Sequence, residues 1–322
     1  MTTAAPETES PKPKPAYRVR NWSEYEAALV QRGSLTLWID ENTLAGWQES
    51  QRTGRRGASR TYSEAAIQCV LTLRALYRLP LRAAEGLLRS ILQLMGTDLP
   101  VPDHTTLSRR GRSLSVTIER RASDAPRHLL IDSTGLKVFG EGEGKVRKHG
   151  AGYRRVWRKL HLAVDAATHE VVATLVTEST VGDAEVLPEL LAQVEGDIAQ
   201  VSADGAYDSR ACHDLLLERK ASAAIPPRAN AAAWEPLPDG RVHPRSAALE
   251  VIQRDGLKAW KQQIGYHRRS LAETAMGRIK GLFGERLQAR SWEGQVNECY
   301  LRVAAMNRMT GLGMPRSEAV HR

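Results

Sequence analysis

The feature that most constrains the fold is a change after residue 127, where helical periodicity gives way to closely spaced strands. Three β-branched segments follow one another at residues 128–138, 157–165 and 170–177. Strands this near along the chain pair most simply as an antiparallel meander. Farther on, strands alternate with helical patterns, with strands at 198–203 and 221–225 and helices at 182–191, 208–218, 262–284 and 293–309. This order predicts an α/β fold in which a mixed sheet is flanked by helices.

The residues before this sheet predict an all-α domain. Ser63 is a plausible N-cap, and apolar residues then recur at helical spacing through two segments. Asp103 can cap a third helix, which begins with short polar side chains followed by Arg109 and Arg110. This pattern predicts a helix-turn-helix around 61–113 whose last helix suits the base edges and phosphates of a major groove. A small helical bundle with a charged exterior is the alternative.

The charge balance points to a polyanionic partner. The chain has 46 Lys and Arg against 37 Asp and Glu, a net charge of +9, so nucleic acid is the first partner to consider. The three cysteines are widely spaced without a CxxC pair, which favours neither a disulfide framework nor a structural zinc site. No apolar run is typical of a signal peptide or a membrane span. We therefore expect a soluble protein of a reducing cytoplasm, with no membrane partner.

Acidic residues occupy three informative positions. The element order is that of an RNase H-like core, which carries acids in its first strand, just past its fourth strand and on a late helix. Those places hold Asp132, Asp204 and Glu273. Three carboxylates can bind two divalent cations that polarise a scissile phosphate, and hard oxygen ligands favour Mg²⁺, with Mn²⁺ as a possible substitute. We interpret two competing acids, Asp208 and Asp183, as helix caps.

The late helix has one chemical face. At about 100° per residue, Tyr266, Arg269, Glu273 and Lys280 lie within roughly 60° of one another, and apolar residues project on the opposite side. A carboxylate flanked by cations suits a metal ligand beside phosphate-binding groups. A solvated face with helical ion pairs is the alternative.

On these residues the sequence resembles DDE-type transposases of bacterial insertion sequences, specifically the insertion sequence five family. The four residues of the chemical face keep every spacing of that family's Y-(2)-R-(3)-E-(6)-K pattern. Residues 130–135 and 201–208 resemble its first and second Asp motifs, and 157–162 resembles its second strand. Residues 17–47 and 99–110 are similar to its N-terminal region.

This resemblance implies a DNA transposase that binds the terminal inverted repeats of its element. It would cut the ends by two-metal hydrolysis at the three acids and join the exposed 3′-OH to target DNA. Arg269 and Lys280 would hold phosphates, and Tyr266 would hydrogen-bond or stack on the DNA. Two ends must be synapsed, so at least a homodimer is expected. Two alternatives stay open, a metal-dependent nuclease without strand transfer and a DNA-binding regulator that has lost catalysis.

A strongly basic stretch interrupts the predicted meander. Between residues 145 and 159 there are seven basic residues and no acid. We predict that this hairpin contacts DNA through Arg154, Arg155, Arg158 and Lys159. A solvated charge run is the alternative. Trp157 is a candidate for stacking on a displaced base, but a tryptophan in a strand is more often part of the core.

The predicted organisation has three parts. Residues 1–16 form a disordered tail, 17–125 a helical DNA-binding domain, and 126–322 an RNase H-like DDE catalytic domain with an irregular insertion near 226–260. The aromatic segment 17–47 carries no assigned role. We expect the protein in the bacterial cytoplasm, associated with the nucleoid.

Overall fold

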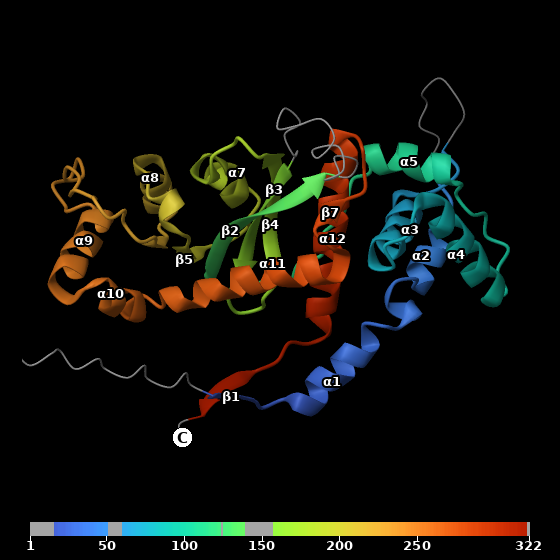
Figure 1. Cartoon of the computed structure of the whole chain (residues 1–322), viewed down its shortest axis with the longest axis horizontal. Coiled ribbons are helices and arrows are strands. Elements are labelled where there is room, and N and C mark those ends of the chain that lie inside the picture. The colour runs from blue at the N-terminus through green and yellow to red at the C-terminus, as the bar shows by residue number, and fades with distance from the viewer. Residues whose placement is uncertain (1–15, 51–59, 124, 139–156, 321–322) are drawn as a thin grey trace, which may run out of the picture.

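The computed structural model describes residues 16–50, 60–123, 125–138 and 157–320 (Figure 1). At its centre is a sheet of six strands, β2 (Arg127–Val138), β3 (Trp157–Asp165), β4 (Val171–Glu178), β5 (Ile198–Ser202), β6 (Ser222–Ala224) and β7 (Arg286–Leu287). The first three form the expected antiparallel meander, and β5 and β6 run parallel to β2 in the order β4-β3-β2-β5-β6. This is the RNase H-like topology, so the predicted fold class is confirmed.

Helices cover both faces of the sheet. On one side lie α11 (Ser270–Phe283) and α12 (Trp292–Leu312), and on the other η2 (Asp183–Val186), α7 (Leu187–Ala192) and α8 (Arg210–Glu218). Successive side chains of a strand point to opposite faces. Accordingly, Leu130 and Leu162 share a hydrophobic cluster with residues of α11 and α12, whereas Leu129 and Ile131 share a second cluster with residues of η2, α7 and α8.

Three helices precede the sheet, α3 (Glu64–Leu76), α4 (Leu81–Leu94) and α5 (His104–Ser113). Ser63 and Asp103 cap α3 and α5 as predicted, because each side chain accepts hydrogen bonds from the first backbone N–H groups of its helix. Residues 95–103 join α4 to α5, a longer connection than the short turn typical of helix-turn-helix motifs. Both α3 and α5 pack on α12, so one hydrophobic cluster extends through both predicted domains. The boundary near 125 stays a prediction.

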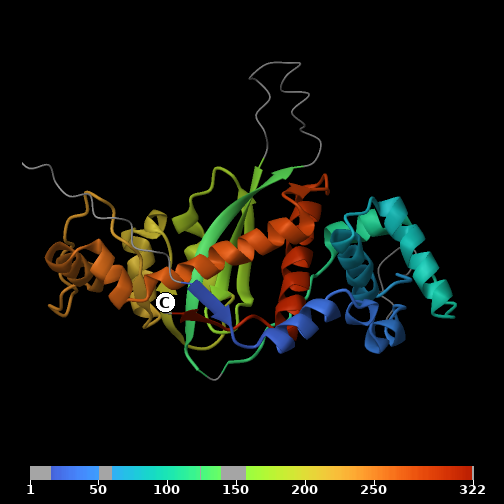
Figure 2. The same cartoon turned by 60° about the horizontal axis from the view of Figure 1, so that its bottom comes forward.

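The two ends of the described chain meet in an arm. Strand β1 (Ala16–Val19) pairs antiparallel with β8 (Ser317–Val320), and β1 leads into α1 (Trp22–Gln31), η1 (Leu35–Leu37) and α2 (Glu41–Ala45). Helix α1 lies beside the C-terminal end of α12 (Figures 1 and 2). The expected tail thus reaches a strand at Ala16, and its other residues lie outside the described ranges.

Two expectations about the C-terminal half are wrong. The insertion near 226–260 is irregular only to residue 243, because α9 (Pro244–Asp255) and α10 (Leu257–Gln263) follow. Helix α9 starts with proline at its first position, an ordinary start signal, and the side chain of His243 caps it. The predicted helix 262–284 is interrupted at Gly265, whose φ of 69° ends α10 and leads into η4 (Tyr266–Arg269) before α11.

None of the helices in the described part of the chain has the length and apolar character needed to cross a membrane.

Candidate active site

Parallel pairing of β2 and β5 brings two of the predicted acids together. Leu130 on β2 is in register with Ser202 on β5, and Asp132 and Asp204 each follow two residues later. This register places both carboxylates at the carboxyl end of β5. The two strands are neighbours, about 4.8 Å apart. Asp204 is also the N-cap of η3 (Gly205–Tyr207), where its Oδ1 accepts a hydrogen bond from the Ala206 backbone N–H at 2.9 Å.

Asp132 is largely withdrawn from water, with 17% of its side chain exposed. Its Oδ1 accepts a hydrogen bond from the Ser133 backbone N–H at 2.9 Å. Burial raises the pKa of Asp132 and the charge of Asp204 adds to this, although the Ser133 hydrogen bond and Arg269 act in the opposite direction. A carboxylate that burial and an acidic neighbour push toward its neutral form is stabilised as an anion by a bound cation.

Arg269 connects the first acid to the third. Its Nη1 donates to Oδ2 of Asp132 and its Nη2 donates to Oε1 of Glu273, both at 2.7 Å. Glu273 lies in the first turn of α11 with 58% of its side chain exposed. Arg269 therefore joins the acid of the central strand to the acid of the late helix, with Asp204 near Asp132. The catalytic role of the three acids stays a prediction.

The other two residues of the spaced motif lie at different distances from the acids. The Tyr266 ring centre is 6.0 Å from the guanidinium carbon of Arg269. Burial raises the pKa of Tyr266, with Arg269 opposing and Asp204 reinforcing the shift. A cavity of about 460 Å³ opens beside it, lined in part by residues of α10. Lys280 lies two turns beyond Glu273 on the same face of α11, roughly 10 Å along the helix axis.

The three acids supply oxygen donors only, which suits Mg²⁺ or Mn²⁺. No group of three His, Cys, Asp or Glu side chains among the described residues is arranged to hold a metal ion as the side chains stand. Arg269 lies between Asp132 and Glu273 and engages one oxygen of each. The donor chemistry therefore fits a divalent cation, and its binding there has to compete with Arg269 for these oxygens.

A second group of polar residues lies behind Asp132. Asp183 accepts hydrogen bonds from the Ser133 hydroxyl and from Lys159 Nζ, both at 3.1 Å. The buried Tyr207 hydroxyl has no hydrogen-bond partner within the described residues. Burial raises the pKa of Tyr207, and the charges of Asp183, Asp204 and Asp132 raise it further. The prediction of Asp183 as a helix cap is wrong, because residue 182 is the cap. These contacts join distant segments, so no local pattern in the sequence predicts them.

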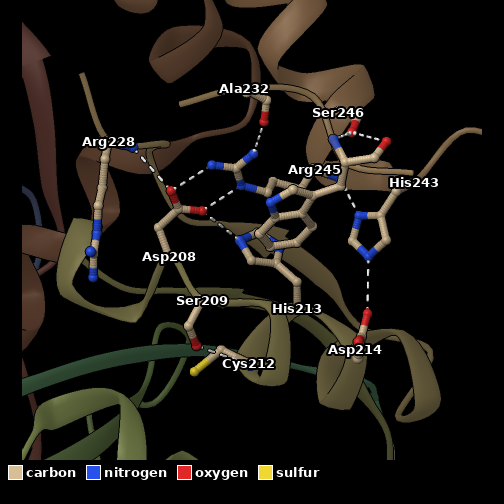
Figure 3. A network of polar contacts seen from close by, with 11 residues as sticks. Asp208, Ser209, Cys212, His213, Asp214, Arg228, Ala232, His243, Arg245 and Ser246 are labelled. Atoms are coloured by element: carbon tan, nitrogen blue, oxygen red, sulfur yellow. Dashed lines mark hydrogen bonds and ion pairs between the residues drawn. The ribbon is translucent and has the colours of Figure 1, made fainter. Parts of the chain in front are cut away.

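Four residues after Asp204, Asp208 belongs to a closed network (Figure 3). Only 1% of its side chain is exposed, and it accepts hydrogen bonds from Arg245 at 2.7 and 2.8 Å and from the Arg228 backbone N–H at 3.0 Å. His213 Nε2 lies 3.2 Å from the same carboxylate. Burial works to raise the pKa of Asp208, but these hydrogen bonds outweigh it and hold the pKa below its ordinary value.

This network fastens the inserted residues to α8. Arg245 on α9 donates to the Ala232 carbonyl at 2.8 Å, and its guanidinium carbon lies 4.1 Å from the Trp234 ring centre. The prediction of Asp208 as the cap of α8 is wrong, because the neighbouring Ser209 accepts the capping hydrogen bond. Arg245 lies thirty-seven residues along the chain from its partner, so the sequence offered no local signal for the pair.

The two arginines predicted to contact DNA from α5 have different surroundings. Arg109 is exposed, as its predicted role requires. Arg110 has 8% of its side chain exposed, pairs with Glu64 at 2.7 Å and donates to the Tyr62 carbonyl. The prediction that Arg110 contacts DNA is therefore wrong, because its guanidinium is committed to the helix packing.

The described end of the basic hairpin is partly buried. Arg158 donates to Gln295 at 2.8 Å and its guanidinium carbon lies 4.9 Å from a tryptophan ring centre on α12. Lys159 is paired with Asp183. Trp157 packs over Gly135, where an added Cβ would come within 3.1 Å of the ring. Arg154 and Arg155 lie outside the described residues. DNA contact by this hairpin stays a prediction.

The topology and the grouped acids define the class, an RNase H-like α/β protein with a carboxylate site at the carboxyl end of β5. Residues 30–141 match one family model described as a transposase DDE domain, and residues 123–308 match a second with the same description. The second match covers more than half of the chain, which therefore belongs to the DDE transposase family. The narrower assignment to insertion sequence five stays a prediction.

One solved structure that resembles this chain is a cryo-electron microscopy structure of a piggyBac transposase synaptic complex with hairpin DNA. The similarity covers 87% of this chain and 73% of that chain, with 11% sequence identity and a TM-score of 0.40.

Proposed function

We propose that this protein is an active DNA transposase that binds the terminal inverted repeats of its own insertion sequence. It cuts the element's ends and joins the exposed 3′-OH to target DNA. The observation that carries this proposal is the convergence of Asp132, Asp204 and Glu273 beside Arg269. Membership of the DDE transposase family supports it.

The three acids are the proposed ligands of two divalent cations. When bound, these cations supply the polarisation of the scissile phosphate and the activation of the attacking hydroxyl. The chain's own residues position the phosphate. Arg269 is within reach of both Asp132 and Glu273, so its fork can exchange a carboxylate for a phosphate oxygen of the DNA. Tyr266, beside it, contacts the same strand, and Lys280 holds a phosphate farther along α11.

The rest of the molecule would hold the duplex. Exposed Arg109 on α5 contacts the repeat, and the basic hairpin before β3 contacts the flanking backbone. The active complex contains at least two copies because two ends must be brought together, and it works in the cytoplasm at the nucleoid. The net charge of +9 supports a polyanionic partner.

The test uses purified protein and a labelled duplex that ends in the inverted repeat flanking its own gene. With Mg²⁺ we expect a nick at the repeat boundary, none with EDTA, and none with Glu273→Gln. Glu293→Gln is a matched control, because Glu293 is likewise exposed in the first turn of a helix but lies outside the site.

Joining of a pre-cut 3′ end to a second duplex separates a transposase from a nuclease. Metal-dependent cutting without joining would favour the nuclease. Specific binding with neither reaction, in Mg²⁺ or Mn²⁺, would contradict the catalytic assignment and favour a DNA-binding regulator.

A further inference from the structure

Arg78 connects the N-terminal helices to the helix that carries Glu273. It is the second residue after α3, and its guanidinium donates hydrogen bonds to two backbone carbonyls of α11. Nη2 lies 2.7 Å from the Gly281 oxygen and 3.1 Å from the Leu282 oxygen, and Nε lies 3.3 Å from the Leu282 oxygen. One exposed side chain therefore joins two segments that are about two hundred residues apart in the sequence.

The two carbonyls lie in the last turn of α11, where a helix needs donors from outside. The last four C=O groups of a helix have no intrahelical donor. In α11 the Gly284 N–H donates to the Lys280 carbonyl at 2.8 Å. Gly281 and Leu282 follow, and Arg78 supplies the donors for them. A cation at this end also suits the helix dipole. Helix α11 thus receives part of its C-terminal cap from the N-terminal region.

The backbone of Arg78 is in the left-handed region, with a φ of 53°. Glycine adopts this conformation without steric cost, and helices commonly end on it. A glycine at this position would keep the turn between α3 and α4 and remove all three hydrogen bonds to α11. A single substitution can therefore separate the link made by the side chain from the turn made by the backbone.

The segment after α11 is also tied to β2, the strand of the first proposed ligand. Strand β7 pairs parallel with the end of β2, and the Lys137 N–H donates to the Glu285 carbonyl at 2.9 Å. Arg74, in the last turn of α3, donates to the Gln288 side chain at 2.6 Å. The end of α3 therefore contacts the place where the catalytic helix and the catalytic strand are joined.

We infer that Arg78 is a positioning residue that sets the register between the bound repeat and the acids, and so decides which phosphate is cut. This inference rests on the proposed function. Helix α3 packs on α5, which carries the proposed repeat contact Arg109. One hydrophobic cluster joins these helices to α11 and α12, but apolar contacts are non-directional. Hydrogen bonds are directional, so the Arg78 fork fixes α11 along its axis.

The experiment maps the nicks on the labelled repeat duplex at single-nucleotide resolution. We expect the wild type to cut one phosphate and Arg78→Gly to spread its nicks over neighbouring phosphates. The cleavage rate should fall on the order of tenfold, because a misplaced phosphate reacts slowly. Affinity for the repeat and its salt dependence should stay as in the wild type, since the substitution removes no DNA contact.

Two further variants accompany this one. Arg78→Lys keeps a cationic donor and the same backbone, so it should restore most of the accuracy of cutting. Lys220→Gly is the matched control. Lys220 is exposed, is the second residue after α8 and has a φ of 55°, but α8 lies on the opposite face of the sheet from α11. This variant should cut at the wild-type phosphate.

A purely structural role predicts a different result. If Arg78 only stabilised the fold, Arg78→Gly would lower the melting temperature and leave the position of the nick unchanged. We expect the melting temperature to stay close to that of Lys220→Gly, because both variants gain the same backbone freedom and water can replace the exposed guanidinium as a donor.

Hydrogen exchange measures the link without catalysis. In EDTA, binding of the repeat duplex should slow exchange of the amides at 279–284 in the wild type, because ordering of α3 reaches the end of α11 through Arg78. We expect no such protection in Arg78→Gly. Equal protection in both proteins would overturn the link.

The outcomes separate this inference from the proposed function. Cutting by Arg78→Gly at the wild-type phosphate would overturn the inference and leave the function intact. A salt slope lower by about 0.9 in this variant would also overturn it, because Arg78 would then hold a phosphate itself. Wild-type protein that binds the repeat without cutting would contradict the proposed function, while exchange protection lost in Arg78→Gly would still support the link. Wild-type protein that does not bind the duplex would overturn both.

Discussion

Asp204 and Asp208 are four residues apart on one loop and have opposite surroundings. Asp204 is partly exposed, stands near Asp132 and accepts a hydrogen bond from its own helical turn. Asp208 is buried and receives hydrogen bonds from Arg245 and the Arg228 backbone. The first carboxylate has capacity left for a cation, and the second has none.

The comparison shows that burial and partners, rather than residue type or motif position, decide what an acid does. A buried carboxylate with its counter-ion organises the chain around it, here the insertion and α8. A carboxylate that is held beside another acid is less favourable without a cation and is therefore suited to bind one. The ion pair of Asp208 thus holds in place the loop that carries Asp204, four residues away.

The sharpest test of this contrast is Asp204→Asn. We expect cleavage to fall on the order of 10⁴-fold, because the amide cannot replace an anionic metal ligand. Stability should change by less than about 1 kcal/mol, since asparagine also caps helices and the repulsion with Asp132 is removed. Cleavage assays and urea unfolding of the same preparation check both. Retained cleavage would exclude Asp204 as a ligand.

Asp208→Ala should show the opposite pattern. It leaves the Arg245 guanidinium buried without its partner, which we expect to cost about 3–5 kcal/mol of unfolding free energy. Asp214→Ala is the control from the edge of the same network, where 42% of the side chain is exposed and the loss should be under about 1 kcal/mol. Equal losses for both variants would mean that the network does not depend on its buried acid.

Acid should unfold the protein partly through two buried histidines. Burial lowers the pKa of His213 to about 4, although the neighbouring Asp208 opposes this, and burial lowers the pKa of His161 to about 4. Both lie below the ordinary value of about 6.5, so the unfolded chain binds more protons between these pH values. Stability should fall as pH drops from about 6.5 toward 4, by about 3 kcal/mol for each histidine.

His213→Gln isolates one of these contributions. Unfolding free energies measured across that pH range should decline by about 3 kcal/mol less in the variant than in the wild type. Asp208 itself should keep its stabilising charge throughout, because its pKa is held below the ordinary value and its contribution is lost only below about pH 4. An unchanged pH slope would show that His213 does not titrate as a buried neutral group.

The smallest effect concerns Arg109 and Arg110. One of these two neighbouring arginines is exposed and the other is buried and paired, as is the case for Asp204 and Asp208. Arg110→Ala should cost about 2 kcal/mol of unfolding free energy, because Glu64 and the Tyr62 carbonyl lose their buried partner. Arg109→Ala should leave stability within about 0.5 kcal/mol and lower the salt slope of DNA binding by about 0.9. A loss of stability in Arg109→Ala together with a lower salt slope in Arg110→Ala would contradict these roles of the two arginines.

Local patterns were sufficient for much of this fold. The meander, the strands and helices that alternate after it, and the caps at Ser63 and Asp103 could be predicted, because strand alternation, helical periodicity and capping are properties of neighbouring residues. The break at Gly265 was missed since the apolar spacing continues across it. Helices α9 and α10 lie within the predicted irregular insertion, because the proline-rich residues before them are typical of irregular structure.

The sequence by itself predicted which residues carry the chemistry, from the spacing of Tyr266 to Lys280 and from two aspartates at strand positions. Only the tertiary structure decided which charges are available. Asp208, Asp183 and Arg110 look like surface or cap residues along the chain, and each acquires its partner from a distant segment. Burial and ion pairing depend on contacts between segments, which no local spacing encodes, so the distinction between a reactive and a structural charge emerges only when the chain has folded.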